Sequence, residues 1–281
     1  MLGSQVLLAL PDGARVIGTD LVERSGVDAA GVDLADPEAV AKLWQEHGPF
    51  SGVIHTAAYT AVDQAEEEEH LAARVNGEAC GVLAAAAARA EIPFVVVSTD
   101  FVFDGSASEP YPEDAATSPL SAYGRTKLQG ELAARAAYPD GTRIVRTQWL
   151  YGPRGKHFPG TMLKLGSERD ELRVVNDQFG SPTSTLELAP ALWDVLLSGE
   201  SGVYHAACEG AATWFDLAQA TLELAGVEGV TIEPCTTEEF PRPAHRPPYS
   251  VLSCERLTAL RGAPLAPWRE ALKTYLGIED S

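Results

Sequence analysis

The chain has 281 residues, 45% of them hydrophobic, which is enough for one large α/β domain or for a main domain with a smaller lobe. Its net charge of −19 repels nucleic acid and anionic membrane surfaces, so we expect neither as a partner. The sequence holds no apolar run of the ~20 residues that span a bilayer, no signal-peptide pattern and no paired Cys or His ligands. We therefore expect a cytoplasmic protein with four reduced cysteines and no metal site.

The first half of the chain alternates strand-like and helix-like segments. The run FVVVST is typical of a buried parallel strand, because it is apolar throughout. The acidic run Glu66–Glu69 is expected to be the solvated first turn of a helix. We predict strands over Ala14–Asp20, Gly52–Ala58, Phe94–Thr99 and Thr142–Tyr151, and helices over Pro37–His47 (capped by Asp36), a stretch ending near Glu91, and Ala122–Tyr138. This alternation predicts an α/β fold with a Rossmann-like, doubly wound parallel sheet in residues 1–152.

The composition of the sequence changes near Gly152. Beyond it Pro and Gly become frequent, and short strands and helices are predicted in no regular alternation. The proline-rich stretch Phe240–Tyr249 is expected to be extended or turning rather than helical. We predict short strands at Leu172–Val175, Val203–Ala207 and Val230–Pro234, and a helix capped at Thr213. Residues 153–281 are therefore predicted to form mainly a smaller substrate-binding lobe, with some segments returning to the main domain.

The sharpest chemical signal is Tyr123-Gly-Arg-Thr-Lys127 on a predicted helix. Residues four apart share one helix face, so the phenol and the ammonium can point into one cleft. A lysine beside a tyrosine stabilises the phenolate and lowers its pKa, which suits proton exchange with a carbonyl or an alcohol. The same spacing also occurs by chance on exposed helices, so the neighbouring sequence has to show whether this pair is functional.

Context comes from Ser98-Thr99-Asp100, which closes the predicted strand FVVVST. Ligands of open α/β sheets bind beyond the carboxyl ends of the strands. A Thr99 hydroxyl at that position can hydrogen-bond the carbonyl oxygen that Tyr123 protonates. For Asp100, a helix cap or turn is a fair alternative.

These residues resemble those of the extended short-chain dehydrogenase/reductases, and more closely those of the dTDP-4-dehydrorhamnose reductase family. The resemblance covers essentially the whole chain, and the stretch VNDQFGSPT is far more specific than YxxxK. The matching stretches are HTAAYTAVDQAE (His55–Glu66), STDFVFDG (Ser98–Gly105), SPLSAYGRTKLQGE (Ser118–Glu131), RTQWLYG (Arg146–Gly152), VVNDQFGSPTS (Val174–Ser184) and RPPYSVLS (Arg246–Ser253).

The resemblance implies that NADH or NADPH reduces the C4 ketone of a dTDP-4-dehydro-6-deoxy sugar, giving dTDP-L-rhamnose from dTDP-4-dehydrorhamnose. Tyr123 would protonate the C4 oxygen, and Lys127 would bind the nicotinamide ribose and lower the pKa of Tyr123. Thr99 stands at the position of the hydroxyl partner of that tyrosine. Asp100 and Trp149 match positions that contact the sugar, although Trp149 is also a candidate buried anchor.

Further positions are candidates for the cofactor and for the substrate diphosphate. A carboxylate at Asp20, at the end of a strand, would accept hydrogen bonds from the adenosine ribose and disfavour a 2′-phosphate, although a turn aspartate is the alternative and Arg24 complicates the choice. Arg246 is a candidate clamp for the diphosphate, because guanidinium matches phosphate bidentately. The remaining cofactor candidates by resemblance are Gly3, Asp33, Leu34, Ala58, Tyr59 and Thr60.

The beginning of the chain lacks a feature that the resemblance predicts. Gly3 matches the third glycine of a G-x-x-G-x-x-G motif, but the central first strand and the two preceding glycines have no residues here. Either the natural start lies upstream, which we expect because the downstream catalytic positions are intact, or this is a relative with impaired cofactor binding.

Three functions remain open from the sequence: the dTDP-4-dehydrorhamnose reductase activity, the same chemistry on another sugar nucleotide, and a non-catalytic binding or regulatory role. Phe101 stands where a tyrosine is more common after Ser-Thr-Asp, which leaves the sugar nucleotide open. The oligomeric state is open as well, a homodimer included.

Overall fold

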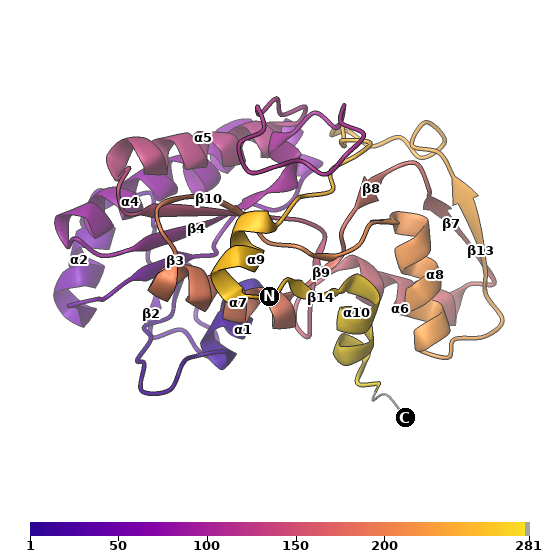
Figure 1. The fold of residues 1–281 in the computed structure, drawn as a ribbon, viewed down its shortest axis with the longest axis horizontal. Coiled ribbons are helices and arrows are strands. Elements are labelled where there is room, and N and C mark those ends of the chain that lie inside the picture. Colours follow the sequence, from indigo (N-terminus) through magenta and orange to yellow (C-terminus); the bar gives the residue numbers. More distant parts are fainter. Residues whose placement is uncertain (279–281) are drawn as a thin grey trace.

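The computed structural model describes residues 1–278. Figure 1 shows two parts: a parallel sheet with helices on both faces, and a smaller lobe built around α6, α8, β7 and β13. The predicted Rossmann-like, doubly wound architecture is confirmed in the main part.

The main sheet has four parallel strands in the order β10-β5-β4-β3. The predicted strand over Phe94–Thr99 is confirmed at both ends as β4, and five of its six residues are buried. Its neighbours are β3 (Val53–His55), β5 (Thr142–Thr147) and β10 (Gly202–His205).

Alternate side chains of β4 supply two different hydrophobic cores. Val95 packs with α1 (Leu2–Leu8) and α7 (Thr185–Ser198), whereas Phe94 and Val96 pack with α2 (Pro37–His47), α4 (Ala79–Arg89) and α5 (Ala122–Ala137). Because helices cover both faces, the strand is apolar along its whole length rather than alternating. The Asp36 cap of α2 is confirmed, since its carboxylate accepts from the Glu38 N–H at 2.9 Å.

The strand predicted over Ala14–Asp20 is much shorter in the structure. Only β1 (Thr19–Asp20) is regular, and it pairs with β2 (Ala29–Ala30) in a separate two-stranded sheet. Within residues 1–278, β3 pairs only with β4 and forms the edge of the four-stranded sheet.

The predicted alanine-rich helix is interrupted. After the 3₁₀ turn η1 (Gln64–Glu66), α3 (Glu69–Ala73) runs into a π-turn, η2 (Arg74–Glu78), before α4 begins. A π-turn inserts one extra residue in a helix and is frequent at functional sites. The prediction that the side chains of Glu66–Glu69 are solvated is wrong in part. Glu66 accepts from the Ala122 N–H at 2.8 Å, and Glu69 pairs with Arg125.

The strand predicted over Thr142–Tyr151 is broken into β5 and β6 (Leu150–Tyr151). The break falls at Trp149, whose φ of +48° lies in the left-handed region that non-glycine residues rarely occupy. The strand ladder cannot continue through that conformation, so β6 turns away to pair with β9 (Thr183–Ser184).

The smaller lobe has its own hydrophobic cluster, in which Met162, Leu172 and Leu222 are buried. The predicted cap at Thr213 is confirmed and forms a reciprocal capping box with Asp216. The lobe consists of α6 (Phe158–Glu168), β7 (Glu171–Val175), β8 (Phe179–Gly180), β12 (Ala212–Thr213), α8 (Trp214–Leu224) and β13 (Thr231–Cys235).

The remaining C-terminal elements pack against the main sheet and its helices. They are β11 (Cys208–Glu209), α9 (Glu255–Arg261), β14 (Leu265–Pro267) and α10 (Trp268–Leu276). Residues 236–250, which we call the strap, form no helix or strand and cross from the lobe back toward the main part (Figure 1). No helix among the described residues is long and apolar enough to cross a membrane. All four cysteines are free thiols.

Candidate active site

The central feature of the site is α5, whose N-terminal end lies against the carboxyl end of β4. The Ser121 hydroxyl caps the helix by accepting from the Gly124 N–H at 3.1 Å. Tyr123, Lys127 and Glu131 follow at intervals of four residues, and Lys127 and Glu131 are buried. The helix therefore turns one polar stripe toward the sheet.

Two glycines permit this close approach. A Cβ at Gly124 would lie 2.2 Å from the Phe101 carbonyl oxygen, and a Cβ at Gly130 would lie 2.0 Å from that of Asn76. Any side chain at either position would push α5 away from the backbone that it contacts. The glycines thus set the depth at which Tyr123 and Lys127 sit.

Tyr123, Thr99 and Asp100 are brought together as the sequence predicted. The Tyr123 phenol lies near the Thr99 hydroxyl and the Asp100 carboxylate, and both affect its pKa. Thr99 in turn donates to Asp100 Oδ1 at 2.9 Å and accepts from the Phe101 N–H at 3.2 Å. Thr99 and Asp100 are buried, while Tyr123 is partly exposed with its ring edge against Phe101.

The electrostatics of Tyr123 differ from the prediction. Burial raises the pKa of Tyr123 to about 12; the Thr99 hydroxyl lowers it and the Asp100 charge raises it further. The expected lowering of this pKa by Lys127 is therefore wrong for the structure described. Burial also lowers the pKa of Lys127, whose charge interacts with Cys80 and Glu131.

The ammonium group of Lys127 is hydrogen-bonded to the main sheet. Its Nζ donates to the Val97 carbonyl oxygen at 2.6 Å. An ammonium has three N–H donors, and this is the one hydrogen bond that its Nζ makes to the described residues. The remaining donors suit hydroxyl groups such as those of a ribose.

A buried ion pair that the sequence analysis missed lies beneath Lys127. Arg146 Nη2 donates to Glu131 Oε2 at 2.7 Å, and the two side chains are 5% and 3% exposed. The Ser98 hydroxyl also donates to Glu131. The spacing of Lys127 and Glu131 was readable from the sequence, but the partner on β5 is brought in only by the parallel register of β4 and β5.

Asn76 is a second residue that the sequence analysis missed. It sits buried in the π-turn η2, where its Oδ1 accepts from the Tyr59 N–H at 2.8 Å and its Nδ2 donates to the Tyr59 carbonyl at 3.1 Å. Its Nδ2 also reaches Thr126 on α5 at 3.2 Å. One amide therefore fixes the loop of Ala58, Tyr59 and Thr60 beside the catalytic helix, and Tyr59 packs in the same cluster as Tyr123.

The candidate residues for the adenosine end lie near β1, β2 and α1. Asp20 ends β1 half-exposed, accepting from the Val22 N–H at 3.1 Å with Arg24 at 3.8 Å. Asp33 pairs with Arg74, which lowers the pKa of that carboxyl, and Leu34 packs at the edge of the second core. Gly3 lies where a Cβ would meet Thr56 Oγ1 at 2.9 Å, so α1 approaches the end of β3 closely.

The Trp149 ring stacks on Trp214 of the smaller lobe. Its ring lies 3.6 Å from that of Trp214 at an interplanar angle of 9°, and a Cβ at Gly180 would meet its edge at 2.6 Å. One face of the indole is thus covered by the lobe. Its left-handed backbone conformation is the kind of strain that clusters at functional sites.

Arg246 is already engaged in an ion pair. Its Nη1 donates to Asp63 Oδ1 at 2.8 Å and to the Ala244 carbonyl at 2.7 Å. Asp63 also receives the Ala244 N–H at 3.3 Å and lies 3.9 Å from Arg242. The strap is therefore attached to the loop that follows β3, next to the catalytic helix.

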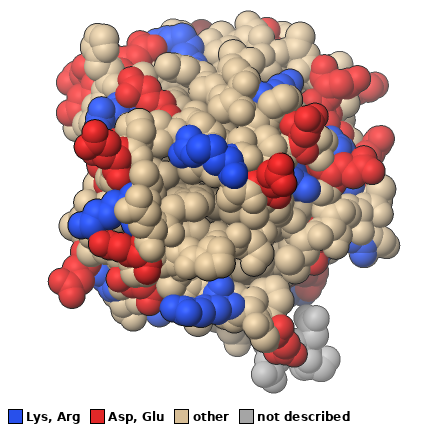
Figure 2. Space-filling view, turned by 90° about the vertical axis from the view of Figure 1, so that its left-hand side faces the viewer, with Lys and Arg blue, Asp and Glu red and all other residues tan. Residues whose placement is uncertain are grey.

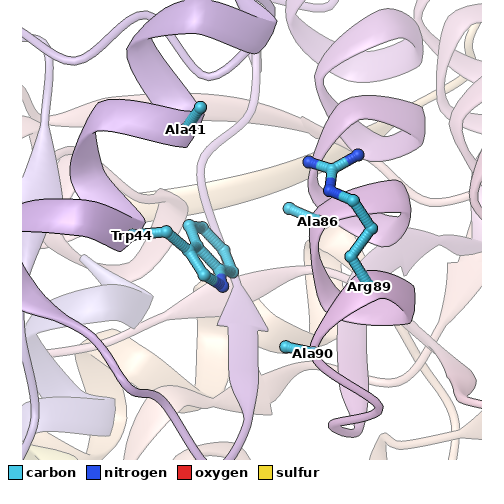
Figure 3. A pocket seen from close by; sticks show the side chains of 5 residues that line it. All are labelled: Ala41, Trp44, Ala86, Arg89 and Ala90. Atoms are coloured by element: carbon cyan, nitrogen blue, oxygen red, sulfur yellow. The ribbon is translucent and has the colours of Figure 1, made fainter.

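A shallow hollow of about 210 Å³ lies elsewhere, between α2 and α4. Figure 3 shows Ala41 and Trp44 on one side of it, facing Ala86, Arg89 and Ala90 on the other. None of the candidate site residues lines it.

The sheet and the group at its carboxyl edge define a nucleotide-binding fold of the short-chain dehydrogenase/reductase type. The family model described as "RmlD substrate binding domain" matches residues 8–280, and the chain belongs to that family. Curated relatives include a dTDP-4-dehydrorhamnose reductase of Streptomyces griseus, 43% identical over 264 residues, covering 90% of this chain and 86% of the relative. A probable dTDP-4,6-dihydroxy-2-methyloxan-3-one 4-ketoreductase of Streptomyces antibioticus is 42% identical, covering 92% and 91%.

Solved structures agree with the family. That of a dTDP-4-dehydrorhamnose reductase from Clostridium acetobutylicum superposes with a TM-score of 0.90 at 42% identity, covering 98% of this chain and 95% of its own. That of the Bacillus anthracis dTDP-4-dehydrorhamnose reductase in complex with NADP gives a TM-score of 0.87 at 33% identity, covering 98% and 94%.

Proposed function

We propose that this protein is an NAD(P)H-dependent reductase of the C4 ketone of a dTDP-4-dehydro-6-deoxy sugar, converting dTDP-4-dehydrorhamnose to dTDP-L-rhamnose. The observation that carries the proposal is the position of Tyr123 beside Thr99 at the carboxyl end of β4, with Lys127 on the same helix face. The names of the S. griseus and C. acetobutylicum relatives support the substrate, and the NADP complex of the B. anthracis relative supports the cofactor.

In this proposal the chain's own residues handle the proton and the orientation of the substrate. Tyr123 donates its phenolic proton to the C4 oxygen, and the Thr99 hydroxyl binds the same oxygen. Lys127 binds the hydroxyls of the nicotinamide ribose through the donors that Val97 does not use. When bound, NAD(P)H supplies the hydride to C4.

The cofactor is proposed to extend from Lys127 along the carboxyl ends of β3, β1 and β2. The loop held by Asn76 would contact it through Ala58, Tyr59 and Thr60, and Asp20 would accept from the adenosine ribose. Gly3, Asp33 and Leu34 complete the proposed contacts. The choice between NADH and NADPH depends on Asp20 and Arg24 together.

The substrate is proposed to lie between the two parts of the chain that divide near Gly152. Trp149 would contact the sugar with the indole face that Trp214 leaves uncovered. Arg246, whose Nη1 is held by Asp63, would bind the diphosphate through its other guanidinium N–H groups. Asp100 is only 2% exposed, so we do not propose that it contacts the sugar directly.

The test is an assay of the purified chain with dTDP-4-dehydrorhamnose and either NADH or NADPH. We expect cofactor oxidation, followed by absorbance at 340 nm, together with a product two mass units heavier than the substrate. Cofactor binding without turnover would favour the regulatory role. Turnover of another nucleotide's 4-keto sugar in preference to the dTDP sugar would redirect the substrate assignment.

A further inference from the structure

Gln178 joins the stacked tryptophans of the site to the beginning of the strap. Its side chain is only 5% exposed, and its two polar atoms face different parts of the chain. The Gln178 Oε1 accepts from the Trp214 Nε1–H at 3.1 Å, and its Nε2 donates to the Thr237 hydroxyl at 2.9 Å. Trp214 is the ring that stacks on Trp149. One buried amide therefore lies between the ring pair and the strap.

The neighbouring groups allow only one orientation of this amide. An indole nitrogen donates and does not accept, so the atom that faces Trp214 has to be the carbonyl oxygen of Gln178. The Thr237 hydroxyl gives its single proton to Asp177 Oδ1 at 2.6 Å, which leaves its lone pairs for the Gln178 N–H. The Thr237 N–H also donates to the Asp177 carboxylate at 2.9 Å. The beginning of the strap therefore fixes the orientation of Gln178, and Gln178 fixes the orientation of Trp214.

The specific stretch VNDQFGSPT is explained in part by these contacts. Its Asn176 accepts from the Thr213 hydroxyl at 2.8 Å, at the cap of α8. Its Asp177 holds Thr237 of the strap. Gln178, the next residue, contacts both the first residue of α8 and the strap. Three consecutive side chains thus connect the helix that carries the stacked ring to the strap.

The other end of the strap lies at the proposed diphosphate position. Arg246, the proposed ligand of the diphosphate, is held there by Asp63. A few residues further on, the Ser250 N–H donates to the carbonyl oxygen of Phe179, the residue after Gln178, at 2.8 Å. The segment proposed to bind the diphosphate is therefore connected at both of its ends to the structure that surrounds the ring pair.

We propose that Gln178 is a positioning residue for the sugar, which holds the Trp149–Trp214 stack in place only when the strap is bound to the lobe. This inference deepens the proposed function and rests on it. Trp149 contacts the sugar, whereas Gln178 acts through Trp214 and touches no reacting atom. Because the ring face binds the sugar equally in the ground state and in the transition state, its displacement raises KM and leaves kcat nearly unchanged.

The first experiment needs no substrate and observes the rings directly. The chain has five tryptophans, so protein labelled with 5-fluorotryptophan gives five ¹⁹F resonances, which Trp149→Phe and Trp214→Phe assign. Thr237→Val removes the acceptor of the Gln178 N–H at a partly exposed position. We expect the Trp214 and Trp149 resonances both to shift in this variant. Thr237→Ser keeps the hydroxyl and should restore both of them.

Two controls show whether the effect is confined to the ring pair. Trp193 donates to the Val6 carbonyl at 2.9 Å in the main part, so its resonance should stay in place in every variant. Thr236→Val removes the neighbouring hydroxyl, which contacts Glu239 at 3.4 Å, and should leave the Trp149 resonance unchanged. A Trp149 resonance that ignores Thr237→Val, or that moves as far in Thr236→Val, would overturn the proposal.

The second experiment measures initial rates at saturating cofactor. Loss of one hydrogen bond in Thr237→Val should raise KM for the sugar nucleotide about fivefold, equivalent to ~1 kcal/mol, with kcat within twofold of wild type. Gln178→Glu still accepts from Trp214, but it places a carboxylate oxygen against the Thr237 hydroxyl, whose proton goes to Asp177. It should raise KM by a similar factor, whereas Thr237→Ser should keep the wild-type KM.

The outcomes separate this inference from the proposed function. A KM that stays at the wild-type value in both Thr237→Val and Gln178→Glu would overturn the role of Gln178. A fall in kcat without a rise in KM would overturn it as well. If wild type does not reduce the dTDP sugar, the proposed function fails, and the ¹⁹F spectra still decide whether Gln178 connects the strap to the ring pair.

Discussion

Tyr123 is placed for proton donation by two neighbours with opposite effects on its phenol. Thr99 stabilises the ionised oxygen and Asp100 destabilises it, while burial keeps the phenol neutral. Tyr123→Phe removes the proton but preserves the ring contact with Phe101. We expect kcat to fall by about 10²–10⁴-fold with little change in cofactor affinity. Steady-state kinetics and NADPH fluorescence titration measure the two quantities.

The matched control is Tyr138→Phe, which removes a phenol from the C-terminal cap of the same helix, outside the site. It should retain wild-type turnover. Should Tyr123→Phe keep more than about half of the wild-type kcat, Tyr123 would not be the proton donor.

The ion pair of Glu131 and Arg146 supports the site from within the fold. Both side chains are almost fully buried, and Arg146 Nη1 has no further partner in the described chain. Glu131→Gln leaves the Arg146 charge in a low-dielectric interior without its counter-charge. We expect the free energy of unfolding to fall by about 3–5 kcal/mol, measured by urea denaturation.

The comparison is Glu46→Gln, which breaks the exposed pair with Lys42 at 3.7 Å. It should cost less than about 1 kcal/mol, because water screens that pair. A similar small loss in Glu131→Gln would mean that the interior around Arg146 is well hydrated.

At the residue scale, the sequence revealed the parts of the site that are close together in the chain. Tyr123 and Lys127 are four residues apart, and Thr99 and Asp100 end one apolar strand, so local patterns were sufficient. Arg146, Asn76 and Asp63 could not be assigned, because each acts through a partner at least 15 residues away. The raised pKa of Tyr123 depends on burial, which the YxxxK spacing does not contain.

At the scale of elements, the strap depends on a few contacts for its position. It has no helix or strand of its own, and Asp63 holds both the Ala244 N–H and the Arg246 guanidinium. Asp63→Ala removes both anchors next to the proposed diphosphate position. We expect KM for the sugar nucleotide to rise about tenfold, equivalent to ~1.4 kcal/mol, while kcat changes less than twofold. Initial-rate kinetics at saturating cofactor measure this split.

Arg242→Gln is the control for this prediction. Arg242 lies 3.9 Å from Asp63 with its side chain 52% exposed, so its loss should change KM by less than twofold. A lower KM in Asp63→Ala would show instead that Asp63 competes with the diphosphate for Arg246.

The predicted strands and helices were confirmed where one local feature of the sequence was dominant. β4 is apolar throughout, and the Asp36 and Thr213 side chains cap their helices as expected. The strand predicted before Asp20 was wrong because most of that segment pairs with no other strand. A hydropathy pattern does not show which strands are hydrogen-bonded to each other. The sequence did not predict the π-turn at Asn76, because the register of that turn is set by its packing against α5.

At the scale of the whole molecule, the net charge of −19 opposes the approach of any anionic substrate. Figure 2 shows acidic side chains gathered toward the edges of one face, with lysines and arginines scattered among them. A sugar diphosphate must therefore be held by local cations. Arg242 and Arg246 both lie at Asp63, at the junction of the strap and the main part.

Three buried groups contribute to the acid stability of the whole fold with opposing effects. Burial, with a smaller contribution from Lys127 for His55 and from Arg146 for His205, lowers the pKa of each histidine to about 3. Below pH 6.5 the unfolded chain then binds more protons at these positions, so the free energy of unfolding falls with pH. Asp100 acts in the opposite direction between about pH 6 and pH 4, because burial raises its pKa to about 6 and the folded chain holds the extra proton.

Two histidines outweigh one aspartate over this range. At ~1.4 kcal/mol per group and pH unit, we expect the free energy of unfolding to fall by roughly 3 kcal/mol between pH 6.5 and pH 4.5. His55→Gln leaves one histidine against Asp100, so the same change should shrink to less than about 1 kcal/mol in that variant. Urea denaturation at four pH values in this window measures both proteins. A wild-type stability that stays constant or rises as the pH falls would mean that the histidines are not held neutral in the folded chain.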